Sequence, residues 1–159
     1  IELNDVGYLM ALTGNSEINR TAISKFQKHF GENGSFRVVS ADEMSDPENN
    51  PQEGLFSHTD DFIKLTEVAR KFPKIQEIEL NSQEHYSGLI EITKTDDDII
   101  PLFVKDNEGD LSIIPSNSQE VAIEEGNMLV YLGKTIETEK MKDSTDLEET
   151  VSKDEEEEN

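Results

Sequence analysis

Apolar and polar residues along the first forty positions follow a spacing that predicts a strand, a helix and a second strand. Val6–Thr13 is an apolar run without alternation, as in a strand buried on both faces. Gly14 breaks this run, and Ser16 is a candidate cap for a helix whose apolar residues recur at helical spacing as far as Phe30. Ser35–Ser40 predicts the second strand. This order is that of a βαβ unit with two parallel strands.

A polar segment and a second group of elements follow. Residues 41–54 are acidic and contain two prolines, which predicts a loop. This loop is either a mobile connector or a lid or partner contact. Phe62–Phe72 carries apolar residues at helical spacing and predicts a helix. Ile75–Leu80 alternates apolar with mainly acidic residues, which predicts a half-buried strand with its acidic face in water.

The third part of the chain is predicted to form a small β module. Ser82–Ser87 is expected to be a loop or short helical turn. Short apolar runs separated by turns predict strands. These strands are Gly88–Ile92, Ile99–Val104, Leu111–Ile114 and Met128–Leu132.

Composition limits the classes of function. The 159 residues include 14 Lys and Arg against 36 Asp and Glu, a net charge of -22. This charge argues against nucleic acid or anionic lipid as a direct partner, because both would repel it. The chain has no cysteine, which excludes disulfides and thiolate metal sites. No apolar run approaches the length of a transmembrane helix.

Two stretches carry resemblances to known families. "YLMALTGNSEINRTAISKFQKHFG" looks like the second-half βαβ of an RCK-type Rossmann domain. More closely, "NDVGYLMALTGNSEINRTAISKFQKHFG" followed by "FRVVS" resembles the cytosolic C-terminal tail of bacterial sodium/proton antiporters of the cation/proton antiporter superfamily. The later "IIP", "EEGN" and "MLVYLG" are similar to the C-terminal ligand-sensing module of RCK (TrkA-type) regulatory proteins, with Asn127 where that family usually has Asp. The antiporter tails contain a truncated Rossmann part joined to such a module in the same order.

The resemblance implies an α/β fold in three parts. Residues 1–54 would be a truncated Rossmann-like βαβ segment with its acidic loop. Residues 55–134 would be a helix plus an RCK-C-like α+β module, and 135–159 a disordered acidic tail. The first residue is Ile, not Met, so we expect a piece of a longer polypeptide.

The function implied is that of a non-catalytic regulatory or assembly domain of a membrane sodium/proton antiporter. Its expected place is the cytoplasmic side of the membrane. Its expected partners are the transmembrane transport domain of the same polypeptide and a second copy in a homodimer, with a small effector possible.

The residues give little sign of cofactor chemistry. No G-x-G-x-x-G fingerprint or P-loop occurs, so no cofactor is expected. Thr13–Ser16 is the one candidate phosphate cradle, and an ordinary helix cap explains it as well.

No metal or catalytic site is predicted. The three histidines, His29, His58 and His85, lack further ligands at a matched spacing. Asp96–Asp98 and the turn Asp106–Asp110 offer oxygen ligands for a hard cation such as Ca²⁺ but lack the spacing of an EF-hand. No nucleophile or acid/base pair is identifiable, so we expect no enzymatic activity.

Two other functions remain open. A ligand-sensing RCK-type module of a potassium channel or transporter would have a pocket between the Gly88–Leu132 strands. An oxidoreductase remnant is what a βαβ unit alone would suggest, but the missing glycine fingerprint counts against it.

Overall fold

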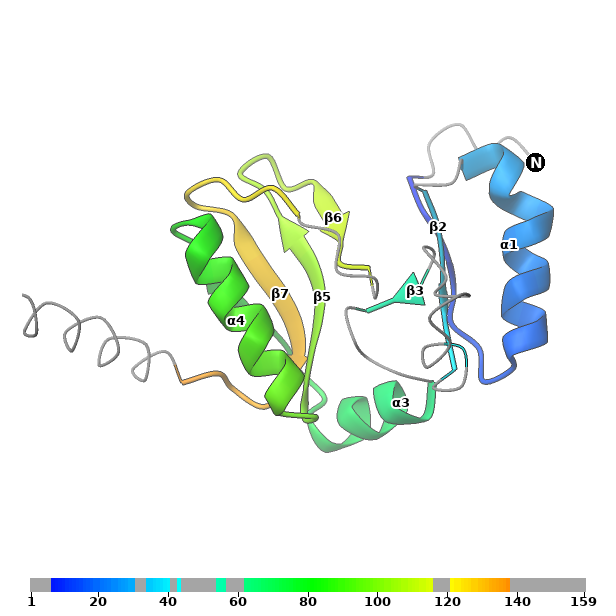
Figure 1. The fold of residues 1–159 in the computed structure, drawn as a ribbon, viewed down its shortest axis with the longest axis horizontal. Coiled ribbons are helices and arrows are strands. Elements are labelled where there is room, and N and C mark those ends of the chain that lie inside the picture. The colour runs from blue at the N-terminus through cyan, green and yellow to red at the C-terminus, as the bar shows by residue number, and fades with distance from the viewer. Residues whose placement is uncertain are drawn as a thin grey trace, which may run out of the picture.

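The computed structural model describes residues 7–30, 34–40, 43, 54–56, 62–115 and 121–137. These residues form an α/β fold with one parallel three-stranded sheet and one antiparallel four-stranded sheet (Figure 1). The elements are β1 Leu9–Ala11, α1 Ser16–Phe30, β2 Ser35–Val38, β3 Gly54–Leu55, α3 Phe62–Lys71, β4 Ile75–Glu79, α4 Gln83–Thr95, β5 Ile99–Lys105, β6 Leu111–Ile113 and β7 Met128–Gly133.

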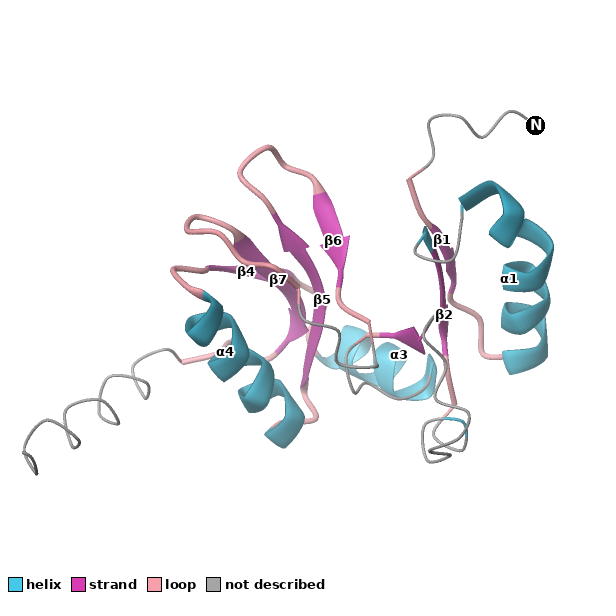
Figure 2. Ribbon diagram, turned by 45° about the horizontal axis from the view of Figure 1, so that its top comes forward, coloured by secondary structure: helices cyan, strands magenta, loops and turns pink. Residues whose placement is uncertain are grey.

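The parallel sheet confirms the predicted βαβ order. Its strands lie in the order β1-β2-β3, with Leu9 opposite Ser35 and Arg37 opposite Gly54. Helix α1 covers the outer face of this sheet (Figure 2). The third strand was not predicted, because β3 has two residues and no run of apolar positions marks it.

The prediction that the first strand is buried on both faces is wrong. Only three residues, Leu9–Ala11, form β1, and it is an edge strand among the described residues. Met10 is 40% exposed and Leu12 is 38% exposed. On the neighbouring helix Ile18 is 57% exposed, so the predicted apolar stripe of α1 is only partly covered. A continuous apolar run therefore did not indicate a strand buried on both faces here.

The antiparallel sheet has the order β4-β7-β5-β6. Helix α4 covers one face of it (Figures 1 and 2). Successive side chains of a strand point to opposite faces, so the central strand β7 contributes Leu129 and Tyr131 to one core and Leu132 to another. The core on the α4 side, called the module core, consists of Leu80, Tyr86, Leu89, Ile99, Val104, Ile114, Leu129, Tyr131 and Ile136.

Helix α4 replaces the predicted loop at Ser82–Ser87 and the predicted strand at Gly88–Ile92. Ser82 is its N-cap, and the Ser82 side chain accepts a hydrogen bond from the backbone N–H of His85. The buried positions Tyr86, Leu89 and Thr93 lie three and four residues apart, which is helical spacing. Gly88 and the local alternation of Leu-Ile-Glu-Ile concealed this periodicity.

A second core joins the two sheets. This junction core contains Phe36, Leu55 and Phe56 from the parallel part, Val68 from α3, and Ile100, Leu102, Ile113 and Leu132 from the antiparallel sheet. The Tyr8 hydroxyl also donates to the carbonyl oxygen of Leu111 at 3.0 Å. Leu55 forms an isolated antiparallel bridge with Pro115. The two sheets therefore share buried apolar surface and pack as one body.

Several smaller predictions are confirmed. The acidic residues of β4, Glu77 and Glu79, face water, although Ile75 is 63% exposed beside them. Gly109 has a φ of 93° in the predicted turn between β5 and β6. The last predicted strand is present as β7.

The core also extends beyond the predicted boundary at Lys134. Ile136 is buried in the module core, and its N–H donates to the Tyr131 hydroxyl at 3.2 Å. Most of the predicted loop at 41–54 and the predicted tail from residue 138 onward lie outside the described residues.

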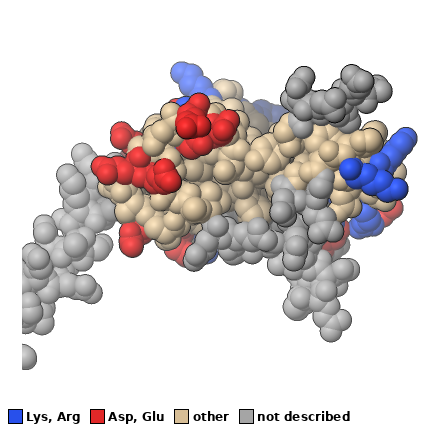
Figure 3. Space-filling view, turned by 90° about the horizontal axis from the view of Figure 1, so that it is seen from above, with Lys and Arg blue, Asp and Glu red and all other residues tan. Residues whose placement is uncertain are grey.

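Charge is distributed unevenly over the molecule. Viewed from above, Lys and Arg side chains gather at the end formed by α1, and Asp and Glu side chains gather near the opposite end (Figure 3). Among the described residues, no helix has the length and apolar character needed to cross a bilayer.

Candidate functional site

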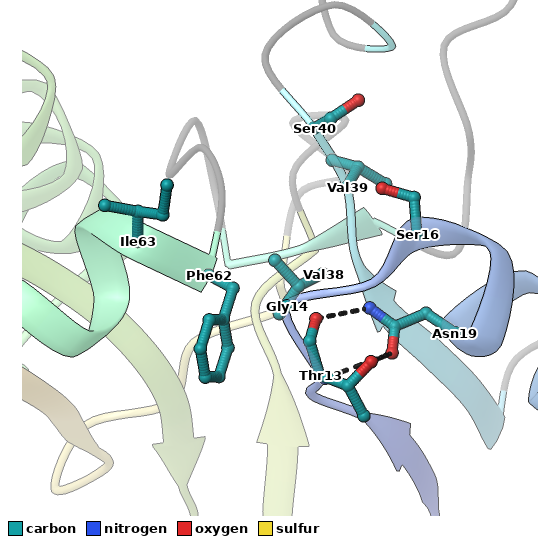
Figure 4. A pocket seen from close by; sticks show the side chains of 9 residues that line it. All are labelled: Thr13, Gly14, Ser16, Asn19, Val38, Val39, Ser40, Phe62 and Ile63. Carbon is teal, nitrogen blue, oxygen red and sulfur yellow. Dashed lines mark hydrogen bonds between the residues drawn. The ribbon is translucent and has the colours of Figure 1, made fainter.

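A pocket of about 150 Å³ lies where β1 and β2 end and α1 begins (Figure 4). In parallel α/β sheets this edge, at the carboxyl ends of the strands, is where ligands usually bind. Helix α3 closes the other side with its first residues. The lining residues are Thr13, Gly14, Ser16, Asn19, Val38, Val39, Ser40, Phe62 and Ile63.

The loop between β1 and α1 is fixed by one buried amide. Asn19 is 1% exposed. Its Oδ1 accepts hydrogen bonds from the Thr13 backbone N–H at 3.0 Å and from the Thr13 hydroxyl at 2.6 Å, and its Nδ2 donates to the Thr13 carbonyl at 2.8 Å. All these polar groups are paired within the protein, so the loop has one well-defined shape.

The predicted cap at Ser16 is corrected to Asn15. The Oδ1 atom of Asn15 accepts a hydrogen bond from the Ile18 backbone N–H at 3.1 Å, and Ser16 is the first residue of the helix. Ser16 is therefore free to line the pocket. Gly14 approaches α3 closely, since a Cβ atom there would lie 3.2 Å from Cδ1 of Phe62.

A second group of polar residues lies beside the pocket and shares Ser40 with it. We call this group the arginine cluster; it consists of Arg20, Arg37 and Ser40, which surround Glu43. The guanidinium of Arg37 donates to both carboxylate oxygens of Glu43, at 2.9 and 3.1 Å. Arg20 of α1 donates to the same carboxylate at 2.9 Å. Ser40 contributes its backbone N–H at 3.1 Å and its hydroxyl at 3.2 Å.

The position of Arg37 follows from the sheet. It lies in the central strand β2, opposite Ala11 on one side and Gly54 on the other, so its neighbours in the sheet are small. Phe36 belongs to the junction core, and alternation along the strand directs Arg37 to the α1 face. The residue is 3% exposed, and a charge so deeply buried requires a paired anion.

The ionisation of Glu43 reflects this environment. Burial disfavours the carboxylate, but hydrogen bonds from Arg37, Arg20 and the Ser40 backbone outweigh it and hold the pKa at about 2. The same contact with Glu43 raises the pKa of Arg20. Glu43 is therefore an anion at every physiological pH.

The arginine cluster was not identified from the sequence, although two signals were present. Ser40 and Glu43 have the S-x-x-E spacing of a capping box. The Ser40 hydroxyl accepts from the Glu43 N–H at 3.3 Å, while the Glu43 carboxylate accepts from the Ser40 N–H. A single arginine inside the apolar strand FRVV was the second signal.

The histidines and aspartates among the described residues do not form a common metal site. His29 is exposed on α1, His85 lies in the first turn of α4, and His58 lies outside the described residues. Among the described residues, no group of three or more His, Asp or Glu side chains is placed to hold a metal ion.

The aspartates have other partners. Asp96 pairs with Lys134, Asp97 with Lys64 and Asp98 with Lys71. In the turn between β5 and β6, the Oδ1 atom of Asp106 accepts from the N–H groups of Glu108 and Asp110, both at 2.8 Å. These carboxylates therefore stabilise local structure.

No protein family matches the chain, and no curated protein or solved structure is significantly similar to it.

Proposed function

We propose that this chain is a regulatory and assembly domain of a membrane sodium/proton antiporter, located on the cytoplasmic side of the membrane and without catalysis of its own. The resemblance of residues 4–31 and 36–40 to antiporter tails motivates the proposal. Its mechanism is packing. The domain pairs with a second copy or docks on the transport domain, and it alters transport by favouring one state of the transporter.

One structural observation supports a packing role most directly. The parallel sheet presents an apolar row on β1, which is an edge strand among the described residues. Met10 and Leu12 in this row are 40% and 38% exposed, and Tyr8, whose hydroxyl binds the carbonyl of Leu111, is 41% exposed. Parallel sheets are normally covered on both faces, and an open strand edge is a template for pairing. We infer that this row, called the β1 edge, contacts another protein surface in the assembled transporter.

The experiment measures antiport in inside-out vesicles from cells that produce the intact polypeptide. The double substitution Met10→Ser and Leu12→Ser should shift the sodium dependence of proton movement several-fold, because it removes apolar area from the docking surface. Ile75→Ser is the matched control, since Ile75 is also exposed but lies on β4. Equal effects of both variants, or none from either, would refute docking through the β1 edge.

A ligand-sensing module of a potassium channel or transporter is the second candidate. The pocket beside α1 favours a sensing role, but it lies at the parallel sheet, whereas that hypothesis expected it between the Gly88–Leu132 strands. The space beside α4 is filled by the module core. The nucleotide-binding oxidoreductase has less support, since the loop Thr13–Ser16 has one glycine, close to Phe62.

A further inference from the structure

The arginine cluster has the composition of an anion-binding site. Arg37 offers a bidentate guanidinium from a buried position, Arg20 offers a second guanidinium, and Ser40 offers an N–H and a hydroxyl. Bidentate arginine with backbone N–H and hydroxyl donors is the donor set by which proteins recognise phosphate. In this structure these residues bind the carboxylate of Glu43, and Arg20 also donates to the carboxylate of Glu17.

The cluster directs more hydrogen bonds at the Glu43 carboxylate than the carboxylate has lone-pair sites. Three residues direct five hydrogen bonds at Glu43, two from Arg37, one from Arg20 and two from Ser40. A carboxylate has two oxygens with about four lone-pair sites. A phosphate group has three terminal oxygens and up to twice the charge. The cluster therefore suits a phosphate better than the single carboxylate that it holds.

The surroundings also provide room for the rest of a ligand. Ser40 belongs both to the arginine cluster and to the lining of the pocket. The pocket continues from Ser40 along Val39 and Val38 to Phe62 and Ile63, so its far wall is apolar (Figure 4). With a volume of about 150 Å³, it suits a small organic group.

We propose that Arg37, Arg20 and Ser40 form a binding site for a small phosphorylated ligand, and that the Glu43 carboxylate fills this site when the ligand is absent. The phosphate replaces the carboxylate against the two arginines, and the organic part of the ligand enters the neighbouring pocket. Because Glu43 competes from within the chain, its high effective concentration weakens the observed affinity for any external anion. This site goes beyond the proposed transporter function and does not depend on it.

The test uses the whole 159-residue chain with inorganic phosphate as the probe, and sodium chloride of equal ionic strength as the reference. The variant Glu43→Ala removes the competing carboxylate. It should bind phosphate at least tenfold more tightly than the unmodified chain, measured by calorimetry and by the rise in melting temperature. The double variant Glu43→Ala with Arg20→Met should lose most of this gain. Arg20 is half exposed, so this change leaves the core intact.

Three outcomes of these binding measurements would overturn the proposed phosphate site. Equal phosphate binding by Glu43→Ala and the unmodified chain would overturn the proposal. The same holds if the Arg20→Met double variant binds as tightly as the single one. If Glu43→Ala is unfolded in chloride, phosphate should restore its native circular dichroism, because it takes the place of the Glu43 carboxylate beside Arg37. A failure of phosphate to restore the fold would also overturn the proposal. None of these measurements involves a membrane or an antiporter.

Discussion

Gly133 at the end of β7 lies directly against the carbonyl group of Asp98. The Lys134 N–H donates to that carbonyl oxygen at 2.9 Å, and Gly133 itself has a φ of 129°. A Cβ atom on Gly133 would overlap the Asp98 oxygen and lie 2.9 Å from Cα of Ile99. The contact joins the start of β5 to the end of β7, so a residue without a side chain is required at this point of the central strand pair.

Replacement of Gly133 by alanine should therefore be severely destabilising. Steric overlap with backbone adds to the cost of a positive φ, and together they should lower the free energy of unfolding by about 3 kcal/mol or more. Gly109→Ala is the matched control, because Gly109 has a φ of 93° but no atom within 4 Å of the added Cβ. It should cost only about 1 kcal/mol in urea unfolding. Equal losses in the two variants would contradict the close approach.

Acid should destabilise the fold through Glu43. Its pKa of about 2 lies below the ordinary value of 4.5, so the stabilising contribution is complete above about pH 5 and is lost as the pH falls toward 2. The difference corresponds to about 3 kcal/mol. Glu43→Gln should remove this part of the pH dependence of urea unfolding between pH 5 and pH 2. An unchanged slope in the variant would show that Glu43 is not paired as described.

Calcium should not stabilise the chain, although Asp96, Asp97 and Asp98 are consecutive. Each of these aspartates is engaged by a lysine, two of them from α3 and one from the chain after β7. A cation would have to displace these ion pairs and would find no preformed cluster of ligands among the described residues. Millimolar Ca²⁺ should change the melting temperature no more than Mg²⁺ at the same concentration. A calcium-specific rise of several degrees would reveal a site.

Ile136 should behave as a core residue. It is 7% exposed and packs in the module core, whereas Ile75 is 63% exposed. Ile136→Ala should lower the free energy of unfolding by about 2 to 4 kcal/mol, the usual cost of truncating a buried isoleucine. Ile75→Ala should cost less than about 1 kcal/mol. Comparable losses at the two positions would mean that the chain after β7 does not pack on the module.

The sequence pattern predicted most elements correctly where a regular apolar spacing ends at a glycine or a polar segment. The helix at 16–30, the β5–β6 hairpin and the last strand all have clear apolar spacing and a glycine or polar break at their ends. Helix α4 was missed because Gly88 and an alternating Leu-Ile-Glu-Ile run have the signature of a strand, while Tyr86, Leu89 and Thr93 form the face that tertiary packing buries. Strand β3 is too short to carry a pattern.

The site was less predictable than the fold. The loop Thr13–Ser16 was recognised as a helix start, but the buried amide of Asn19 that shapes it could not be inferred from spacing alone. In the arginine cluster, Arg37, Ser40 and Glu43 are close in sequence, whereas Arg20 comes from α1. Only the fold brings Arg20 to Arg37 and Glu43, so no local motif could reveal their convergence.

The proposal of an antiporter domain is tested most directly by finding the polypeptide in its native cells. Membrane and soluble fractions would be separated and probed with an antibody raised against this chain. The proposal predicts a membrane-bound band several times heavier than the 17.9 kDa of these 159 residues. A soluble band near 17.9 kDa would contradict it, and the free sensing module would then be the better explanation.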